Sequence, residues 1–420
     1  MAADNVNLGA NLTLNGDRLW DSLMEMAKIG PGIAGGNNRQ TLTEDDKAGR
    51  DLFKRWCEEA GLTISVDRMG NMFARRSGRD DSLPPVMAGS HLDTQPTGGR
   101  FDGITGVLAA LEAVQTMNDL GLETERPIEI VNWTNEEGAR FGPPMMGSAV
   151  FAGVMTEQMA YETADADGET MGAALEAIGY QGETPAAARP IHAFFEIHIE
   201  QGPYLEREKK AIGVVTGVQA MRWYKARVLG EARHAGTTPP SARKDALTAA
   251  ARLTLELDGI MQRRGDDGRV TVGVFQAYPG SPNVCPDRVE FTVDMRNPTT
   301  DELNAMDREF RAAAEQLYLD TGCGVEIEET WFSEPVVFDP ACVDAVRRGA
   351  EAAGHASRDI MSGAGHDAVN VNKIAPAAMI FIPCEDGVSH NEAEYASPEA
   401  VAAGADVLLA AMLEFAGDAD

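Results

Sequence analysis

Short apolar segments that each end in a cluster of polar residues are the feature that most restricts the fold of this chain. Residues 85–90 lead into HLDT, residues 127–133 lead into TNEE, and residues 194–199 lead into EQG. Residues 104–120 form an apolar segment with helical spacing. Strands alternating with helices predict an α/β domain with a mainly parallel sheet, in which ligands bind beyond the carboxyl ends of the strands. The polar clusters therefore mark the expected site.

A second pattern begins at about residue 214 and predicts a different kind of domain. Strands are expected at 221–232, 270–280, 288–297 and 324–332, and helices at 244–261 and 300–319. This βαββαβ order with antiparallel hairpins indicates a compact α+β domain. Farther along, helix, strand and helix return at 342–353, 377–382 and 398–415. We therefore expect a discontinuous α/β domain, residues 1–213 and 334–420, interrupted by an inserted α+β domain at 214–333.

Composition restricts the class of protein. The 420 residues are enough for two domains, and no apolar run approaches the roughly 20 residues that span a bilayer. A formal net charge of −30 argues against nucleic acid and anionic membranes as partners, and reflects either solubility or an organism with acidic surfaces. Five scattered cysteines without a CxxC pair, and a start without a secretory signal, favour a reducing compartment. We expect a soluble cytoplasmic protein.

Three of the seven histidines are candidates for a metal site. His91, His198 and His390 lie at the ends of expected strands or in polar turns beside carboxylates. Imidazole and carboxylate groups are the usual ligands of catalytic zinc and similar divalent ions. A single histidine is more often structural, but these three stand in segments that each hold an acidic or amide partner. Together with the Glu-Glu segment these are HLDTQPTGGRFDG, NEEGARFG, EIHIEQG and VSHNEAE.

These segments, in this order along nearly the whole chain, resemble the dinuclear metal aminoacylase and carboxypeptidase superfamily. The resemblance is to its N-carbamoyl-L-amino-acid amidohydrolase branch, which also holds β-ureidopropionase and allantoate amidohydrolase. It implies two divalent ions, zinc, manganese, cobalt or nickel, with Asp102 bridging them. The implied ligands are His91, Asp102, Glu137, His198 and His390. Such a set leaves a shared position where water becomes hydroxide near neutral pH.

The resemblance also implies roles for residues around the ions. Glu136 would be the general base, because one member of a Glu-Glu pair binds metal while the other stays free to move a proton. Asp93 would hold the imidazole tautomer of His91. A cis peptide bond between Asp102 and Gly103 is a further expectation from the family pattern.

Substrate contacts are implied for other segments. His234 in GEARHAGTTP would hydrogen-bond the developing oxyanion. Asn283 and Arg296 would hold the substrate carboxylate, which the planar guanidinium meets with two parallel hydrogen bonds. Weaker candidates are Gln201, Gly365 and His366, of which His366 is equally open to a local structural role. The resemblance further implies a homodimer formed through the insert, which would act as a lid and carry His234 to the partner's site.

The choice of substrate depends on small differences. Many deacylases and glutamate-releasing carboxypeptidases of the superfamily carry an aspartate where this chain has His198, so the carbamoyl-cleaving branch is favoured. We expect hydrolysis of N-carbamoyl-L-amino acids, or of N-carbamoyl-β-alanine, to the amino acid, CO₂ and ammonia. The two substrates differ by one methylene, which the sequence does not distinguish. The alternatives are an allantoate amidohydrolase and a non-catalytic binding protein of the same fold.

Overall fold

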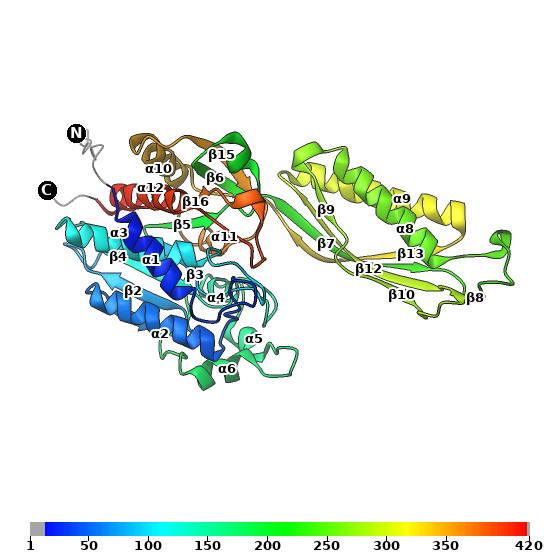
Figure 1. Cartoon of the computed structure of the whole chain (residues 1–420), viewed down its shortest axis with the longest axis horizontal. Coiled ribbons are helices and arrows are strands. Elements are labelled where there is room, and N and C mark those ends of the chain that lie inside the picture. The colour runs from blue at the N-terminus through cyan, green and yellow to red at the C-terminus, as the bar shows by residue number, and fades with distance from the viewer. Residues whose placement is uncertain (1–12, 418–420) are drawn as a thin grey trace. The chain divides into compact units, whose positions relative to one another are not determined.

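The computed structural model describes residues 13–417, and these form two compact units (Figure 1). The larger unit contains the described residues up to Thr216 and from Phe338 onward, and the smaller unit is Gly217–Val337. The inserted unit thus begins and ends a few residues later than the sequence pattern suggested. Within the described residues, no helix combines the length and apolar character that crossing a membrane requires.

A nine-stranded sheet forms the centre of the larger unit. Its order is β1-β2-β4-β3-β5-β16-β6-β14, with β15 paired to β6. The central strands β4, β3, β5 and β16 run parallel to one another. Toward the edges, β2 pairs antiparallel with β1 and β4, and β6 pairs antiparallel with β16 and β14. The strands are β1 (Thr63–Val66), β2 (Met72–Arg76), β3 (Val86–His91), β4 (Ile128–Trp133), β5 (Ala193–Ile199), β6 (Ile212–Val218), β14 (Val336–Val337), β15 (Ser357–Ser362) and β16 (Ala377–Ile382). Every residue of the four central strands is buried, as expected for a sheet covered on both faces.

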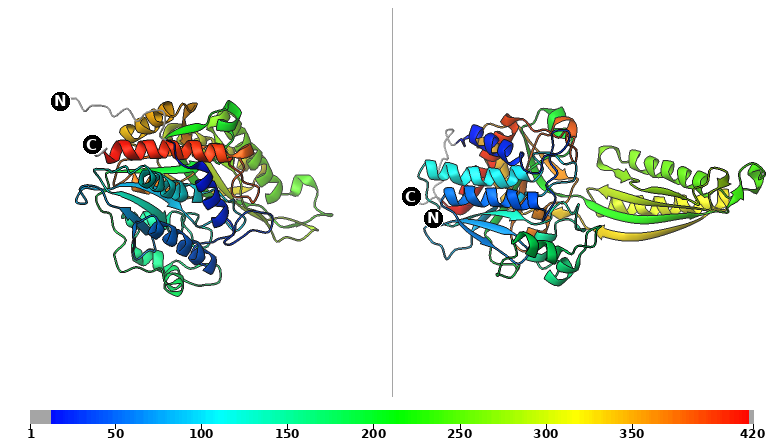
Figure 2. Two further views of the ribbon diagram at one scale, coloured as in Figure 1. Left: turned by 60° about the vertical axis from the view of Figure 1, so that its left-hand side comes forward. Right: turned by 60° about the horizontal axis from the view of Figure 1, so that its bottom comes forward.

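Alternating side chains of β5 show how helices cover the two faces. The Phe195 ring packs on Phe415 of α12, while the next residue, Glu196, accepts a hydrogen bond from the Ala368 amide of α11 on the opposite face. Helices α3, α10 and α12 pack side by side (Figure 2). The helices of this unit are α1 (Gly16–Met26), α2 (Glu44–Glu59), α3 (Ile104–Asp119), α4 (Met146–Phe151), α5 (Glu157–Glu162), α6 (Met171–Ile178), α7 (Tyr204–Glu208), α10 (Pro340–Ala352), α11 (Asp367–Val371) and α12 (Pro398–Ala416).

Capping side chains explain where several helices begin. Thr43 accepts the Asp46 amide at the start of α2, and Ser397 accepts the Ala400 amide at the start of α12. The first turn of α2 holds three acidic residues, which the positive end of the helix dipole stabilises. By contrast, α3 has no side-chain cap, and its N-cap residue is Gly103, directly after Asp102.

The inserted unit has the expected α+β architecture, with helices α8 and α9 on one face of an antiparallel sheet (Figure 1). Its strands and helices are β7 (Ala220–Leu229), β8 (Arg233–His234), α8 (Ala246–Gln262), β9 (Arg269–Thr271), β10 (Phe275–Tyr278), β11 (Val284–Cys285), β12 (Arg288–Asn297), α9 (Thr300–Thr321) and β13 (Gly324–Ser333). The main sheet has the order β10-β12-β7-β13, with β9 also on β12. In place of the single strand expected at 270–280 there are two, β9 and β10. Between them the Val274 amide donates to the Thr292 side-chain hydroxyl, which interrupts the backbone ladder.

Candidate metal centre

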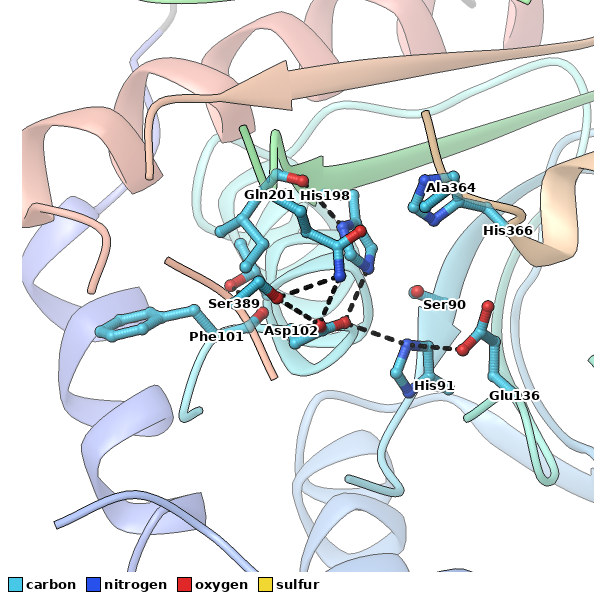
Figure 3. A network of polar contacts seen from close by, with 12 residues as sticks. Ser90, His91, Phe101, Asp102, Glu136, His198, Gln201, Ala364, His366 and Ser389 are labelled. Carbon is cyan, nitrogen blue, oxygen red and sulfur yellow. Dashed lines mark hydrogen bonds and ion pairs between the residues drawn. The ribbon is translucent and has the colours of Figure 1, made fainter. Parts of the chain in front are cut away.

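Five side chains meet beyond the carboxyl ends of the central strands. Two groups of potential ligand atoms share one carboxylate, and within each group all the atoms lie within 4.8 Å of one another. The first group is His91, Asp102 and His198, and the second is Asp102, Glu137 and His390. Figure 3 shows Asp102 at the centre, between His198 and His91. Parallel strands bring His91, Glu137 and His198 together because β3, β4 and β5 all end at the same edge of the sheet, whereas Asp102 and His390 lie in the loops before α3 and α12.

Backbone carbonyl groups set the tautomers of the two buried histidines. Nδ1 of His91 lies 2.9 Å from the Asp93 carbonyl oxygen, and Nδ1 of His198 lies 2.9 Å from that of Ile199. A carbonyl oxygen only accepts, so each Nδ1 carries the hydrogen. The lone pair of each neutral ring is then at Nε2, which lies 3.5 Å (His91) or 3.0 Å (His198) from Oδ1 of Asp102.

The Nε2 lone pairs of His91 and His198 thus face the Asp102 carboxylate oxygen, which is also an acceptor. A cation between these atoms would be favourable. Nε2 of His91 is buried and has no hydrogen-bond partner among the described residues. Burial disfavours charge on His91, but the carboxylates of Glu136 and Asp102 outweigh it and raise its pKa well above the ordinary value. A divalent ion would satisfy the imidazole lone pairs and the carboxylate together, and the donor set fits such an ion. The cluster can therefore bind metal.

The second group is more open to solvent. Nε2 of His390 lies 3.6 Å from Oδ2 of Asp102 and 3.5 Å from Oε2 of Glu137, and the His390 side chain is 51% exposed. Its backbone has a φ of 53°, in the left-handed region that few non-glycine residues adopt. Burial raises the pKa of Glu137 to about 8, although the Gln95 amide and side chain both donate to its carboxylate. A positive ion beside Glu137 would offset this desolvation.

Glu136 is buried directly beside the first ligand group. Its Oε2 lies 3.5 Å from Nε2 of His91, and burial raises its pKa well above the ordinary value. The amides of Glu136 and Glu137 both donate to the Asp93 carboxylate, at 3.4 and 3.3 Å. This carboxylate lies 3.8 Å from Nδ1 of His91, so the contact expected of it is made by the Asp93 carbonyl instead. Asp93 therefore orients the Glu-Glu pair as well as His91.

Gln201 and His366 also lie against the cluster. Nε2 of Gln201 donates to Oδ2 of Asp102 at 2.7 Å and to the Ser389 hydroxyl at 3.0 Å. The His366 ring packs edge-on against His198, with centroids 4.5 Å apart, and its Nε2 lies 3.0 Å from Oγ of Ser362. Burial and the neighbouring His198 lower the pKa of His366 well below its ordinary value, so its ring is neutral. These contacts give His366 a structural contact with His198, and its substrate role stays a prediction.

The remaining candidate beside His366 is Gly365. A Cβ atom at this position would lie 3.0 Å from the Met145 methyl group, so the backbone here is close-packed. The end of the Met145 side chain could move by a few tenths of an ångström, so this contact does not by itself require glycine at the position.

Three candidates belong to the inserted unit and not to the unit that carries the metal cluster. His234 lies on β8, which pairs with β11, and Asn283 directly precedes β11. The Ala235 amide donates to the Asn283 carbonyl oxygen at 2.9 Å, so the backbone holds these two candidates close together. Arg296 lies on β12, and its guanidinium forms an ion pair with Asp294 at 2.6 Å.

The His234 side chain is exposed and has a fixed tautomer. Its Nδ1 accepts the amides of Gly236 and Thr237, at 3.1 and 3.2 Å. An Nδ1 that accepts leaves the hydrogen of the neutral ring on Nε2, which can therefore donate.

Comparison with known proteins identifies the family. The model of Peptidase family M20/M25/M40 matches residues 87–414. The chain belongs to this family. An N-carbamoyl-L-amino-acid amidohydrolase of Rhizobium meliloti is 52% identical over 97% of this chain and 98% of its own length. An allantoate amidohydrolase of Bacillus subtilis is 34% identical over 93% and 95%.

Solved structures agree with this assignment. The crystal structure of an amidase of the hydantoinase/carbamoylase family from Burkholderia multivorans superimposes with a TM-score of 0.92. It is 52% identical in sequence and covers 96% of this chain and 98% of its own. The resemblance to the N-carbamoyl-L-amino-acid amidohydrolase branch is thereby confirmed, as is the predicted α/β fold with a mainly parallel sheet and an inserted α+β domain.

One expectation drawn from the M20/M25/M40 pattern is wrong. Among the described residues the cis peptide bonds are Gly142–Pro143 and Tyr278–Pro279, and the bond between Asp102 and Gly103 is not one of them. Gly103 has a φ of 70°, and a Cβ atom there would overlap the His91 ring. Glycine follows Asp102 because the imidazole packs directly on its backbone.

Two residues at the centre of this M20/M25/M40 site were not singled out from the sequence. Ser389 and Glu394 both stand in the VSHNEAE segment, and both contact Asp102. Burial raises the pKa of Glu394 to about 7. Serine and glutamate are common in polar turns, so their types carried no signal. Their proximity in sequence to His390 was the only available clue.

Proposed function

We propose that this chain is a metal-dependent amidohydrolase that cleaves the ureido C–N bond of N-carbamoyl-L-amino acids to the amino acid, CO₂ and ammonia. The observation that carries the proposal is the Asp102 carboxylate shared by two ligand groups, with Glu136 free beside them. The 52% identical relative of that name supports the substrate class. The non-catalytic alternative is disfavoured, because a binding protein has no need of the buried Glu136.

Two divalent ions are proposed, held by His91, Asp102, Glu137, His198 and His390. When bound, they would supply Lewis acidity toward water and the ureido carbonyl. Glu136, whose Oε2 lies 3.5 Å from Nε2 of the proposed ligand His91, takes the proton of the attacking water and returns that proton to the leaving nitrogen. Zinc, manganese, cobalt and nickel all accept this ligand set.

Residues of the insert are proposed to recognise the substrate. Nε2–H of His234 donates to the oxyanion, and the exposed ring with a fixed tautomer supports this role. Arg296 and Asn283 bind the substrate carboxylate, for which Arg296 would exchange its present contact with Asp294. Gln201 and Gly365 would complete the binding surface on the other unit.

Assembly and location are proposed as well. A homodimer formed through the insert is supported by its exposed helix residues, among them Leu255 on α8 and Leu319 on α9. A cytoplasmic location is supported by the five cysteines, which are all free and buried.

The test is a substrate panel. The purified chain, stripped and reloaded with each of the four metals, is offered N-carbamoyl-L-amino acids, N-carbamoyl-β-alanine and allantoate. The Glu136→Gln chain serves as the matched blank. The proposal expects the free α-amino acid with CO₂ and ammonia as products. Turnover confined to allantoate, with ureidoglycine as product, would overturn it in favour of the function of the Bacillus subtilis relative.

A further inference from the structure

A buried glutamate holds the backbone on either side of the shared ligand. The Glu394 residue is 4% exposed, and its Oε1 accepts the amides of Phe101 and Asp102, at 3.1 and 3.0 Å. Gly99 leaves room for this carboxylate, since a Cβ atom there would overlap Oε1. A carboxylate that accepts two adjacent amides restricts how the peptide between them can turn.

The other oxygen of Glu394 reaches the carboxylate of the same ligand through one hydroxyl. Oε2 of Glu394 lies 3.1 Å from Oγ of Ser389, which in turn lies 3.1 Å from Oδ2 of Asp102. Nε2 of Gln201 donates to that hydroxyl and to Oδ2 of Asp102 (Figure 3). The single hydroxyl hydrogen can point to either carboxylate, so Ser389 links the two.

Aromatic side chains next to Asp102 and Glu394 in sequence also pack together. The Trp20 ring stacks on Phe101 at a centroid distance of 5.6 Å, and Tyr395 meets both rings edge-on, at 6.3 and 5.8 Å. Phe101 and Tyr395 are the neighbours of Asp102 and Glu394 in sequence. The segments around residues 101 and 394 are therefore fixed to each other by a polar and an apolar contact.

We propose that Glu394 is a positioning residue that sets the metal affinity of the site by orienting Asp102. A carboxylate shared by two ions must direct its oxygens differently: Oδ1 faces the buried histidines and Oδ2 faces His390. Rotation of Asp102 by a small angle would weaken both ion positions at once. This inference rests on the proposed function only in assuming that metal binds, and it needs no particular substrate.

Three substitutions at one position separate geometry from charge. In Glu394→Ala both contacts are lost. In Glu394→Asp the charge stays, but the shorter side chain cannot span the two amides and Ser389. In Glu394→Gln the amide oxygen still accepts both N–H groups, and the NH₂ group can donate to Ser389.

Glu392→Ala is the matched control. Glu392 lies in the same turn and carries the same charge, but it accepts the amides of Ile33, Ala34 and Gly36 instead of those at the shared ligand. This control tests whether loss of any acidic residue that binds backbone amides from this turn lowers the metal affinity.

Affinity for Zn²⁺ and for Mn²⁺ is measured by competition with a chelator, on chains whose folding is verified by circular dichroism. Partners that orient metal ligands typically contribute about 10–100-fold to affinity, so Glu394→Ala should lose that much and Glu394→Asp a smaller part. Glu394→Gln and Glu392→Ala should stay within a few-fold of the natural chain.

Natural affinity in a folded Glu394→Ala chain would overturn the proposal, as would an equal loss in Glu392→Ala. If Glu394→Ala does not fold, the metal affinity of Glu394→Asp is the test. An affinity equal to that of the natural chain in Glu394→Asp would then overturn the proposal. Loss of affinity in these variants supports the positioning role even where the natural chain hydrolyses no ureido substrate, which would refute the proposed function alone.

Discussion

Nε2 of His198 lies 3.0 Å from Oδ1 of Asp102, while Nδ1–H of the same ring faces the Ile199 carbonyl oxygen. In its neutral form the ring presents a lone pair to a carboxylate. Burial opposes charge on His198, but Asp102 outweighs it and raises the pKa of His198. This pair of acceptors therefore favours a cation between them, and a metal ion would supply it.

Removal of metal should lower the thermal stability of the protein. A ligand present at 100 times its Kd stabilises the folded state by about 2.7 kcal/mol, which chelation would remove. Scanning calorimetry before and after dialysis against a chelator measures the change, and added Zn²⁺ should restore it. Identical unfolding with and without the chelator would show that the cluster holds no ion.

Glu136→Gln should leave metal content and folding nearly unchanged while turnover falls by about 10²–10⁴-fold, because a general base is lost and the ligands remain. Elemental analysis and steady-state kinetics of the same preparation measure both. His91→Ala is the contrast, since it should lose metal as well as activity. Near-normal turnover of Glu136→Gln would exclude the proposed role.

Arg296→Lys should raise KM sharply for substrates with a carboxylate, because the charge stays but the two parallel hydrogen bonds do not. Amide analogues that lack the carboxylate should respond much less. The measurement is KM and kcat for both substrate types in both chains. An equal response would mean that Arg296 does not bind the carboxylate.

Mixing two inactive chains tests whether sites are shared between subunits. If His234 acts in the partner's site, a heterodimer of His234→Ala and Glu136→Gln chains contains one complete site and one that lacks both groups. Activity should then return on mixing under conditions of subunit exchange. Verified exchange without regained activity would place His234 in the site of its own chain, with the metal ligands unaffected.

Acid should weaken one ion-pair cluster on the insert. The Arg264 and Arg263 guanidinium groups donate to Glu309 and lower its pKa to about 2. A depressed folded-state pKa gives stability that is present above the unfolded value, about 4.5, and is lost as pH falls toward 2. Glu309→Gln should therefore destabilise at pH 7, by at most about 1 kcal/mol for so exposed a cluster, and much less at pH 3.

Urea unfolding at several pH values measures that difference. Glu315→Gln on the same helix α9 is the control, since it is exposed and should change stability little at any pH. A Glu309→Gln deficit that does not shrink below about pH 4.5 would show that the arginines contribute no pH-dependent stability.

The sequence by itself determined the architecture and the chemistry of the ligands. Short strand segments that alternate with helical segments, such as residues 85–90 before 104–120, predict a mainly parallel sheet, and parallel strands end at a common edge. His91 and His198, which lie on β3 and β5, therefore converge at that edge. The α+β insert was predicted from the pattern of apolar residues as well, because alternating strand segments in a βαββαβ order begin at about residue 214.

Only the tertiary structure decided how the shared ligand is held. The contact of Glu394 with the Asp102 amide joins residues 292 positions apart, and the Asp93 carbonyl replaces its carboxylate at His91. The trans bond after Asp102 likewise accompanies the packing of Gly103 against the His91 ring. Local patterns report which face of an element is apolar. They do not report which polar atoms meet when distant segments pack, because a hydrogen bond forms or fails with differences of a few tenths of an ångström in the donor–acceptor distance.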